Sequence, residues 1–106
     1  MAKNIVAANI ADRCLVQLAY VIGVAKPVSV SVETFGTSPE KAWTIARAIE
    51  RCVNLTPRGI REQLKLDRPI YVPTSSGGHF GREPDSEGHF SWEATSLVQD
   101  LLAALP

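Results

Sequence analysis

The chain has 106 residues, 45% of them apolar, and a formal net charge of zero from 11 basic and 11 acidic side chains. This length suits one modest domain, and the balanced charge argues against nucleic acid or an anionic membrane as a partner. No apolar run reaches the roughly 20 residues of a membrane span, and the N-terminus lacks the pattern of a secretory signal. We therefore expect a cytoplasmic protein whose two cysteines, Cys14 and Cys52, are free thiols.

Two strands joined by a short turn form the centre of the predicted fold, after a first helix over residues 2–11 that Asn9 interrupts. Over residues 14–22 every even position is apolar, and over residues 28–35 valines alternate with polar residues. This alternation is typical of strands with one buried face. The turn between them contains glycine and proline and is about four residues long, which is a usual hairpin length.

Three more helices are predicted, and two of them begin in the same way. A hydroxyl residue that can cap free N–H groups is followed by a proline, which fits the first helical position. Ser38 precedes such a helix over residues 39–53, and Thr56 precedes a shorter one over residues 57–65. Ser91 is expected to cap a final helix that extends almost to the C-terminus.

Residues 67–91 form a long segment rich in proline and glycine, in which the periodicity fails. Only Ile70–Val72 resembles a strand, and Pro73 limits it to a sheet edge. A structureless loop of about 25 residues is uncommon inside a compact domain, so we expect this segment to pack on another domain or subunit. Together the elements predict a single domain, residues 1–106, of the α+β class. It is expected to be a two-layer α/β sandwich, with a small, mostly antiparallel sheet covered by helices on one face.

The residues that could carry chemistry do not form a complete catalytic or metal-binding set. His79 and His89 could join the two cysteines as zinc ligands, but the spacings match no compact zinc pattern. Nothing in the sequence brings a cysteine next to a histidine as a nucleophilic pair. His79 is better explained by a side-chain hydrogen bond that orders the glycine-rich loop. We therefore assign no catalytic residue and no metal ligand to this chain.

Two further patterns have a functional and a structural interpretation. The loop Gly77–Arg82 could present backbone N–H groups to an anion such as phosphate, although no Walker lysine follows it. Arg58, Arg61, Lys65 and Arg68 have helical spacing. Such a row of cations favours a solvated helix face, and pairing with the acidic groups of a partner is the alternative.

Several short motifs occur in order along nearly the whole chain. They are Ala2–Ala8 with Ala11–Cys14, Tyr20–Pro27, Glu33–Thr37, Leu55–Ile60, Arg68–Tyr71, Gly78–Arg82 and Phe90–Glu93. Each motif alone is weak, but together they resemble the C-terminal domain of the S-adenosylmethionine synthetase (methionine adenosyltransferase) family. The chain departs from that family at Asn9, where glycine is usual, and at Ser75–Gly77, where Ala-Ala-Tyr is usual.

The resemblance implies an enzyme that joins methionine to ATP, forms S-adenosylmethionine, and releases phosphate and diphosphate. It implies Mg2+ and K+ as cofactors, three similar α/β domains, and active sites between two subunits. The partners would then be the remaining domains, a second subunit, ATP and methionine. The family's His-Pro-Asp motif, metal-binding aspartates and Lys-containing phosphate loop have no counterpart here. The chain is therefore expected to be an inactive C-terminal fragment that supplies scaffold, interface and one pocket wall.

Ile22 is the one position that the resemblance carries into the substrate pocket. It matches an isoleucine at a strand end that lines the apolar part of the family's methionine and adenosine site. The alternative is that Ile22 is ordinary core, because it continues the apolar face of its strand. A second function also stays open, namely a free-standing, non-catalytic binding or assembly domain that retains the fold.

Overall fold

The structure is a computed structural model that describes residues 1–106 and divides them into two compact units. Unit 1 comprises Met1–Thr56 with Thr95–Pro106, and unit 2 comprises Pro57–Ala94. The organisation of the chain as a single domain stays a prediction. None of the helices has the length and apolar character needed to cross a membrane.

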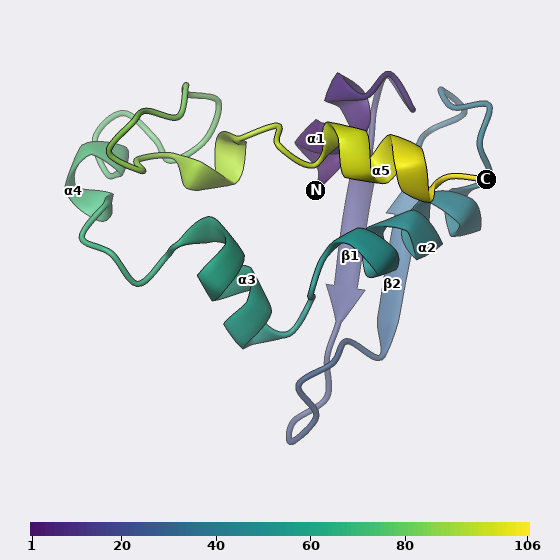
Figure 1. Cartoon of the computed structure of the whole chain (residues 1–106), viewed down its shortest axis with the longest axis horizontal. Coiled ribbons are helices and arrows are strands. Elements are labelled where there is room, and N and C mark those ends of the chain that lie inside the picture. Colours follow the sequence, from purple (N-terminus) through teal and green to yellow (C-terminus); the bar gives the residue numbers. More distant parts are fainter. The chain divides into compact units, whose positions relative to one another are not determined.

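The helices and strands follow the chain in the order shown in Figure 1. Unit 1 contains α1 (Ala2–Ala7), β1 (Leu15–Ala19), β2 (Ser29–Glu33), α2 (Ala42–Cys52) and α5 (Val98–Ala104). Unit 2 contains α3 (Pro57–Leu64), α4 (Tyr71–Thr74) and the short 3-10 helix η1 (Ser91–Glu93).

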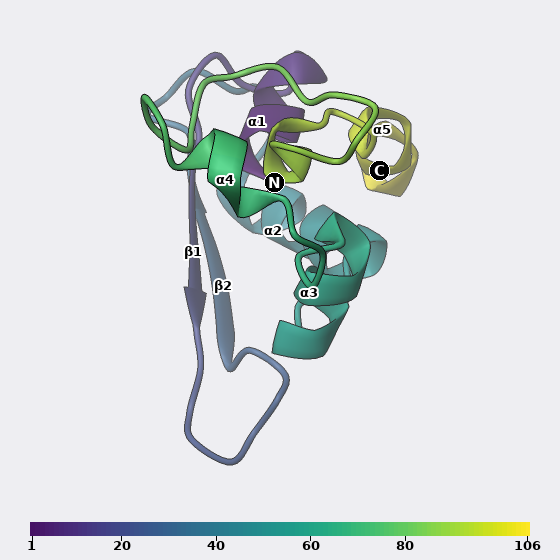
Figure 2. The same cartoon turned by 90° about the vertical axis from the view of Figure 1, so that its left-hand side faces the viewer.

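The sheet of unit 1 consists of β1 and β2, which pair antiparallel with Leu15 opposite Glu33 and Ala19 opposite Ser29. Helices α1, α2 and α5 lie on one side of this sheet (Figure 2). Helix α2 packs on β2, and α5 packs on both α2 and α1. The strand residues that pack with the core are Val16, Leu18, Val30 and Val32. The predicted α+β class, with a small antiparallel sheet covered by helices on one face, is confirmed.

The core of unit 1 is formed by large aliphatic side chains from the three helices. Ile5 of α1, Ile45 and Ile49 of α2, and Leu101 of α5 are almost completely buried. Ile45 and Ile49 are four residues apart, so they lie on one stripe of their helix and both reach the core. The side-chain oxygen of Asn4 accepts a hydrogen bond of 3.0 Å from the backbone N–H of Leu97, which ties α1 to the start of α5.

Both strands are shorter than predicted. The alternation over residues 14–22 continues past Ala19, but the chain leaves the ladder there. The second strand ends at Glu33 because the backbone turns: Phe35 has a φ of 55°, which extended chain does not adopt. The Glu33 carboxylate accepts the N–H of Phe35 at 2.7 Å and stabilises this turn.

Two helices of unit 1 are also shorter than predicted. Helix α1 ends at Ala7, because Asn9 has a left-handed φ of 57° and cannot continue a right-handed helix. Helix α2 begins at Ala42, three residues later than expected. The hydroxyl of Ser38 does not cap this helix, and it accepts the N–H of Glu40 at 3.1 Å in the preceding turn.

Two predictions for unit 2 and its C-terminal boundary are wrong. Ile70–Val72 is not an edge strand, since the chain forms the helical turn α4, whose first turn tolerates Pro73. The single final helix is instead two elements, η1 and α5, because the backbone is extended at Ala94. Ser91 does not cap a helix, and its hydroxyl donates a hydrogen bond of 2.6 Å to the carbonyl oxygen of Leu64.

Candidate functional site

The hairpin tip, residues 20–27, extends beyond the last pair of the sheet, Ala19 with Ser29 (Figures 1 and 2). Ile22 lies in this tip, and its relative exposure is 106%, so no neighbour in the chain covers it. The alternative that Ile22 is ordinary core is therefore wrong for this chain. Val21 and Val24 beside it are about half exposed. The tip thus presents apolar side chains to solvent, where another domain or a ligand can contact them.

A tight turn places Ile22 at the end of the hairpin. Gly23 follows it with a φ of 88°, a conformation that glycine adopts without steric cost. The N–H of Val24 donates to the carbonyl oxygen of Val21 at 3.2 Å and closes the turn. Because both groups belong to the tip, this bond fixes the shape of the turn and not its direction.

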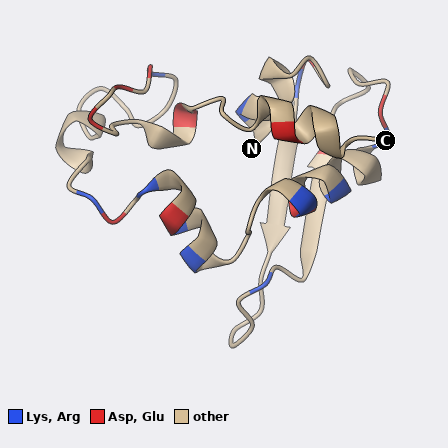
Figure 3. Cartoon of the chain, in the orientation of Figure 1, with Lys and Arg blue, Asp and Glu red and all other residues tan.

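The tip is tied to the helical layer by Tyr20. Its hydroxyl donates a hydrogen bond of 2.7 Å to the carbonyl oxygen of Leu55, in the segment that follows α2. Leu55 is itself a core residue with 5% relative exposure. The tip carries a single charged residue, Lys26. In Figure 3 the hairpin loop shows the blue of lysine or arginine and no red.

A cavity of about 290 Å³ lies where the hairpin returns toward the helices. It is lined by Lys26, Pro27, Glu50, Val53, Asn54, Leu55 and Thr56. The side-chain oxygen of Asn54 is engaged there, because it accepts hydrogen bonds from the backbone N–H and the hydroxyl of Thr56. The returning arm of the hairpin therefore borders open space.

The motif Glu33–Thr37 connects the end of β2 to the start of β1. The Thr37 hydroxyl oxygen accepts the backbone N–H groups of Asp12 and Arg13, each at 3.1 Å. The same hydroxyl donates to the carbonyl oxygen of Thr34 at 2.7 Å. The Arg13 guanidinium lies 4.6 Å from the centre of the Phe35 ring. These contacts give the motif a structural role.

Trp92 organises the proline- and glycine-rich segment of unit 2. Its ring stacks on Tyr71 with the planes 9° apart and meets Phe90 edge-on. Its indole N–H donates to the carbonyl oxygen of His79 at 2.8 Å. The Nδ1 atom of His79 lies 3.1 Å from the hydroxyl of the buried Thr74. The prediction that His79 orders this loop through a side-chain hydrogen bond is confirmed.

The glycine-rich loop Gly77–Arg82 uses its polar groups within unit 2. The N–H of Gly81 donates to the Glu93 carboxylate at 2.8 Å, so an acid already occupies the place that an anion would take. The Arg82 guanidinium lies 4.5 Å from the centre of the Phe90 ring and donates to the carbonyl oxygen of Ser76. The phosphate-site alternative gains no support from this geometry.

The row of cations on and after α3 faces solvent in this chain, and its pairing with the acidic groups of a partner stays a prediction. Its members Arg58, Arg61, Lys65 and Arg68 are all exposed. Arg58 forms one ion pair, a contact of 3.9 Å with Glu62, and both side chains are largely exposed. Such pairs contribute little to stability.

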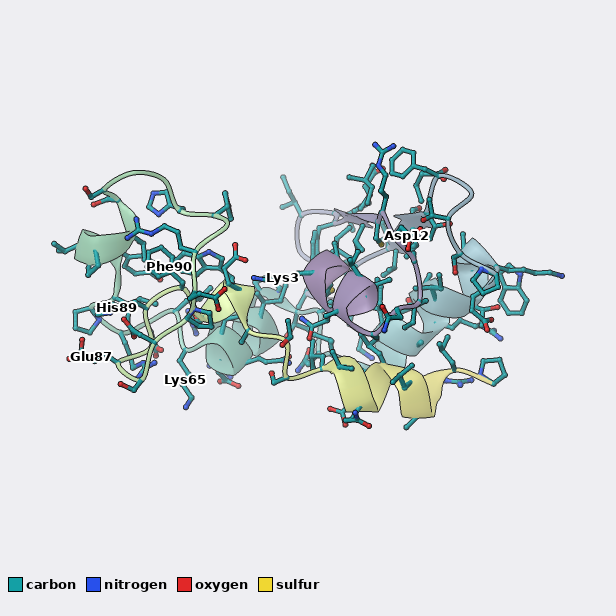
Figure 4. All side chains as sticks on the ribbon, turned by 90° about the horizontal axis from the view of Figure 1, so that it is seen from above. Lys3, Asp12, Lys65, Glu87, His89 and Phe90 are labelled. Atoms are coloured by element: carbon teal, nitrogen blue, oxygen red, sulfur yellow. The ribbon has the colours of Figure 1, made fainter.

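Asp85, Glu87 and His89 form a polar cluster that the sequence analysis did not identify. Figure 4 labels two of them, Glu87 and His89. The Nδ1 atom of His89 lies 2.6 Å from one carboxylate oxygen of Asp85 and 3.8 Å from Glu87. The other Asp85 oxygen accepts the backbone N–H groups of Glu87 and His89. The hydrogen bond from the His89 side chain is the main reason why the pKa of Asp85 is below its ordinary value. The Asp-x-Glu-x-His spacing was the available signal.

This cluster does not fit Mg2+ or K+. Mg2+ prefers an octahedron of oxygen ligands and K+ is likewise a hard cation that oxygen atoms bind, whereas the cluster offers two carboxylates and one imidazole nitrogen. The Asp85 carboxylate is already engaged by His89 and by two backbone donors. We interpret the cluster as a structured turn.

The two cysteines are free thiols, as predicted, and both are partly buried. Burial raises the pKa of Cys14 and of Cys52 above the ordinary value for a thiol. Thiols with a raised pKa carry little of the reactive thiolate at neutral pH. Neither cysteine therefore has the environment of a nucleophile.

The chain thus has an α+β fold with an exposed apolar hairpin tip. The family model for the S-adenosylmethionine synthetase C-terminal domain matches residues 1–94. This chain belongs to that family.

Known relatives extend the match to almost the whole chain. The S-adenosylmethionine synthase of Paracoccus denitrificans is 59% identical over 95% of this chain, and that of Nitrobacter hamburgensis is 56% identical over 99%. A solved structure of an unusual S-adenosylmethionine synthetase from Campylobacter jejuni superposes with a TM-score of 0.84 at 35% identity and covers 99% of this chain. The chain spans only 26% of the two synthases and 27% of the solved chain.

Proposed function

We propose that this chain is the C-terminal part of an S-adenosylmethionine synthase, a methionine adenosyltransferase. The complete enzyme forms S-adenosylmethionine from ATP and methionine and releases phosphate and diphosphate. The family match over residues 1–94 supports this proposal. The length of the chain, about a quarter of its relatives, supports a role as one part of the enzyme. In this proposal the enzyme is cytoplasmic.

The fully exposed Ile22 is the observation that carries the proposed role of this part. Covering a fully exposed isoleucine with another surface is favourable, because full burial of such a side chain contributes about 1.5–3 kcal/mol of free energy. We assign Ile22 to the apolar wall of the methionine and adenosine pocket. The wall acts by excluding water from the bound substrate and by orienting it, and it takes part in no proton transfer.

The other domains of the enzyme and a second subunit are the proposed partners. Large apolar residues that unit 1 leaves uncovered support this assignment, because they resemble surface that packs on a neighbour. They include Leu15, Val21, Val24, Val28, Phe35 and Trp43. Leu15 lies on the outward side of β1, the side opposite α1, α2 and α5.

Mg2+ and K+ are assigned to the other parts of the enzyme. The residues of this chain that could hold a metal do not fit either ion, as described for the Asp85 cluster. When bound, Mg2+ would neutralise the charge of the phosphate groups. The residues of this chain contribute apolar contact and scaffold only.

The proposal is tested by joining this chain to the remaining three quarters of a synthase relative and assaying the product. The complete polypeptide is expected to form S-adenosylmethionine from ATP and methionine with Mg2+ and K+, and the isolated chain is expected to form none. The unmodified relative serves as the positive control. Enzyme-like turnover by the isolated chain would contradict the proposal, and so would a folded but inactive complete polypeptide.

A further inference from the structure

We propose that Tyr20 is a positioning residue, which holds the hairpin tip and thereby Ile22 in the direction that substrate contact requires. This inference rests on the proposed function. Tyr20 lies two residues before Ile22, at the first position after β1. Its hydroxyl reaches the carbonyl oxygen of Leu55 at 2.7 Å, so one hydrogen bond connects the tip to the helical layer.

The bond has one fixed end. Leu55 is a core residue with 5% relative exposure, so its backbone is held in place by packing. The other end lies in the exposed tip, where Val21, Ile22 and Val24 are not buried against the core. The Tyr20 hydroxyl therefore restrains the tip relative to the core.

The other hydrogen bonds of the tip do not join it to the helices. The bond from Val24 to Val21 lies within the turn, and the bond of 2.8 Å from the N–H of Val28 to Ala19 joins the two arms. Both bonds are retained when the whole tip swings relative to the helices. The returning arm borders a cavity of about 290 Å³ at Lys26 and Pro27, so packing leaves room for such a swing.

The decisive variant is Tyr20→Phe, which removes the hydroxyl and keeps the ring. Tyr71→Phe is the matched control, because the Tyr71 hydroxyl also donates to a backbone carbonyl, that of Leu66, within unit 2. When the Tyr20 hydrogen bond is removed, the ratio of correctly oriented to misoriented tips is expected to fall on the order of 3- to 10-fold. In the complete synthase, KM for methionine or ATP should therefore rise by about 3- to 10-fold in Tyr20→Phe, with kcat changed less than about twofold.

Two readouts separate positioning from a general structural role. In a background that already carries Ile22→Ala, adding Tyr20→Phe should no longer raise KM, because the side chain that Tyr20 positions is gone. Tyr71→Phe should leave KM unchanged. Equal KM values for Tyr20→Phe and the wild-type enzyme would overturn the proposal, whether or not the melting temperature fell.

A measurement without catalysis keeps this inference distinct from the proposed function. Backbone NMR order parameters of residues 21–26 in this chain should fall in Tyr20→Phe and stay at wild-type values in Tyr71→Phe. Unchanged order parameters would overturn the positioning role even if the enzyme is active. An inactive wild-type synthase would refute the proposed function, and the order parameters would still decide whether Tyr20 restrains the tip.

Discussion

Truncating Ile22 should separate substrate contact from folding, because the structure leaves this side chain completely uncovered. Ile22→Ala removes no buried surface from the chain, so the free energy of unfolding should change by less than about 0.5 kcal/mol. The same change at Ile45, which has 0% relative exposure, leaves a cavity in the core. Ile45→Ala should therefore lower the free energy of unfolding by about 2–5 kcal/mol.

The order of the two variants should reverse when substrate use is measured. If Ile22 lines the pocket, its truncation removes contact worth about 1–3 kcal/mol, which lowers kcat/KM by about 10- to 200-fold. The folded fraction of Ile45→Ala should keep a kcat/KM close to that of the wild type, because its side chain lies in the core. Urea titration of the isolated chain gives the stabilities, and steady-state kinetics of the complete synthase gives kcat/KM for methionine and ATP.

Two results would refute this reasoning. If Ile22→Ala destabilised the isolated chain as strongly as Ile45→Ala, the side chain would be packed and the described exposure would be wrong. If Ile22→Ala left kcat/KM unchanged for both substrates, the pocket assignment would fail, because this chain has no other residue assigned to the pocket.

Three further predictions concern steric strain, titration and thiol reactivity. Gly88 has a φ of 91°, a conformation that strains any L side chain, so Gly88→Ala should cost about 1–3 kcal/mol in urea titrations, whereas the Arg68 guanidinium near its Cβ can move aside; a cost that vanished in an Arg68→Ala background would show that the backbone is not strained. The folded pKa of Asp85 is lowered mainly by its hydrogen bond with His89, so its contribution to stability is full above the ordinary pKa of about 3.9 and is lost as pH falls through the lower folded value. NMR titration should show this pKa moving toward its ordinary value in His89→Ala, and no movement would contradict the assigned cause. Burial raises the pKa of Cys14, so iodoacetamide should modify it more slowly at pH 7 than it modifies free cysteine, and an equal rate would contradict this environment.

The layers of the fold could be predicted from the sequence, because the required patterns are periodic. Alternating valines such as Val30 and Val32 gave β2, and the four-residue spacing of Ile45 and Ile49 gave the buried stripe of α2. Periodicity in a sequence does not show at which residue a strand or helix ends. The apolar alternation that includes Ile22 continues beyond the last strand pair, so the sequence could not distinguish a strand end from a solvent-exposed tip.

The sequence was least informative where the chain turns at the end or the start of an element without glycine. Phe35, Lys65 and Phe90 all have positive φ values, although bulky side chains are uncommon in that region. These conformations are imposed by the surroundings, as the bond from the Phe35 N–H to Glu33 illustrates. The turn of Asp85 and His89 was missed for a similar reason, since it depends on short-range hydrogen bonds that no periodic pattern records.

The left-handed conformation of Asn9 helps to explain why this chain can differ from most of its family at this position. The resemblance places glycine at this position in most members, so asparagine there looks like a substitution in a conserved motif. Asn9 nevertheless has a φ of 57°, and asparagine is, after glycine, among the residues that adopt this conformation most readily. The turn that ends α1 thus requires a backbone angle that both residues can adopt. Exchange between the two residues can drift neutrally while the turn that ends α1 persists, so this difference is no sign of altered function.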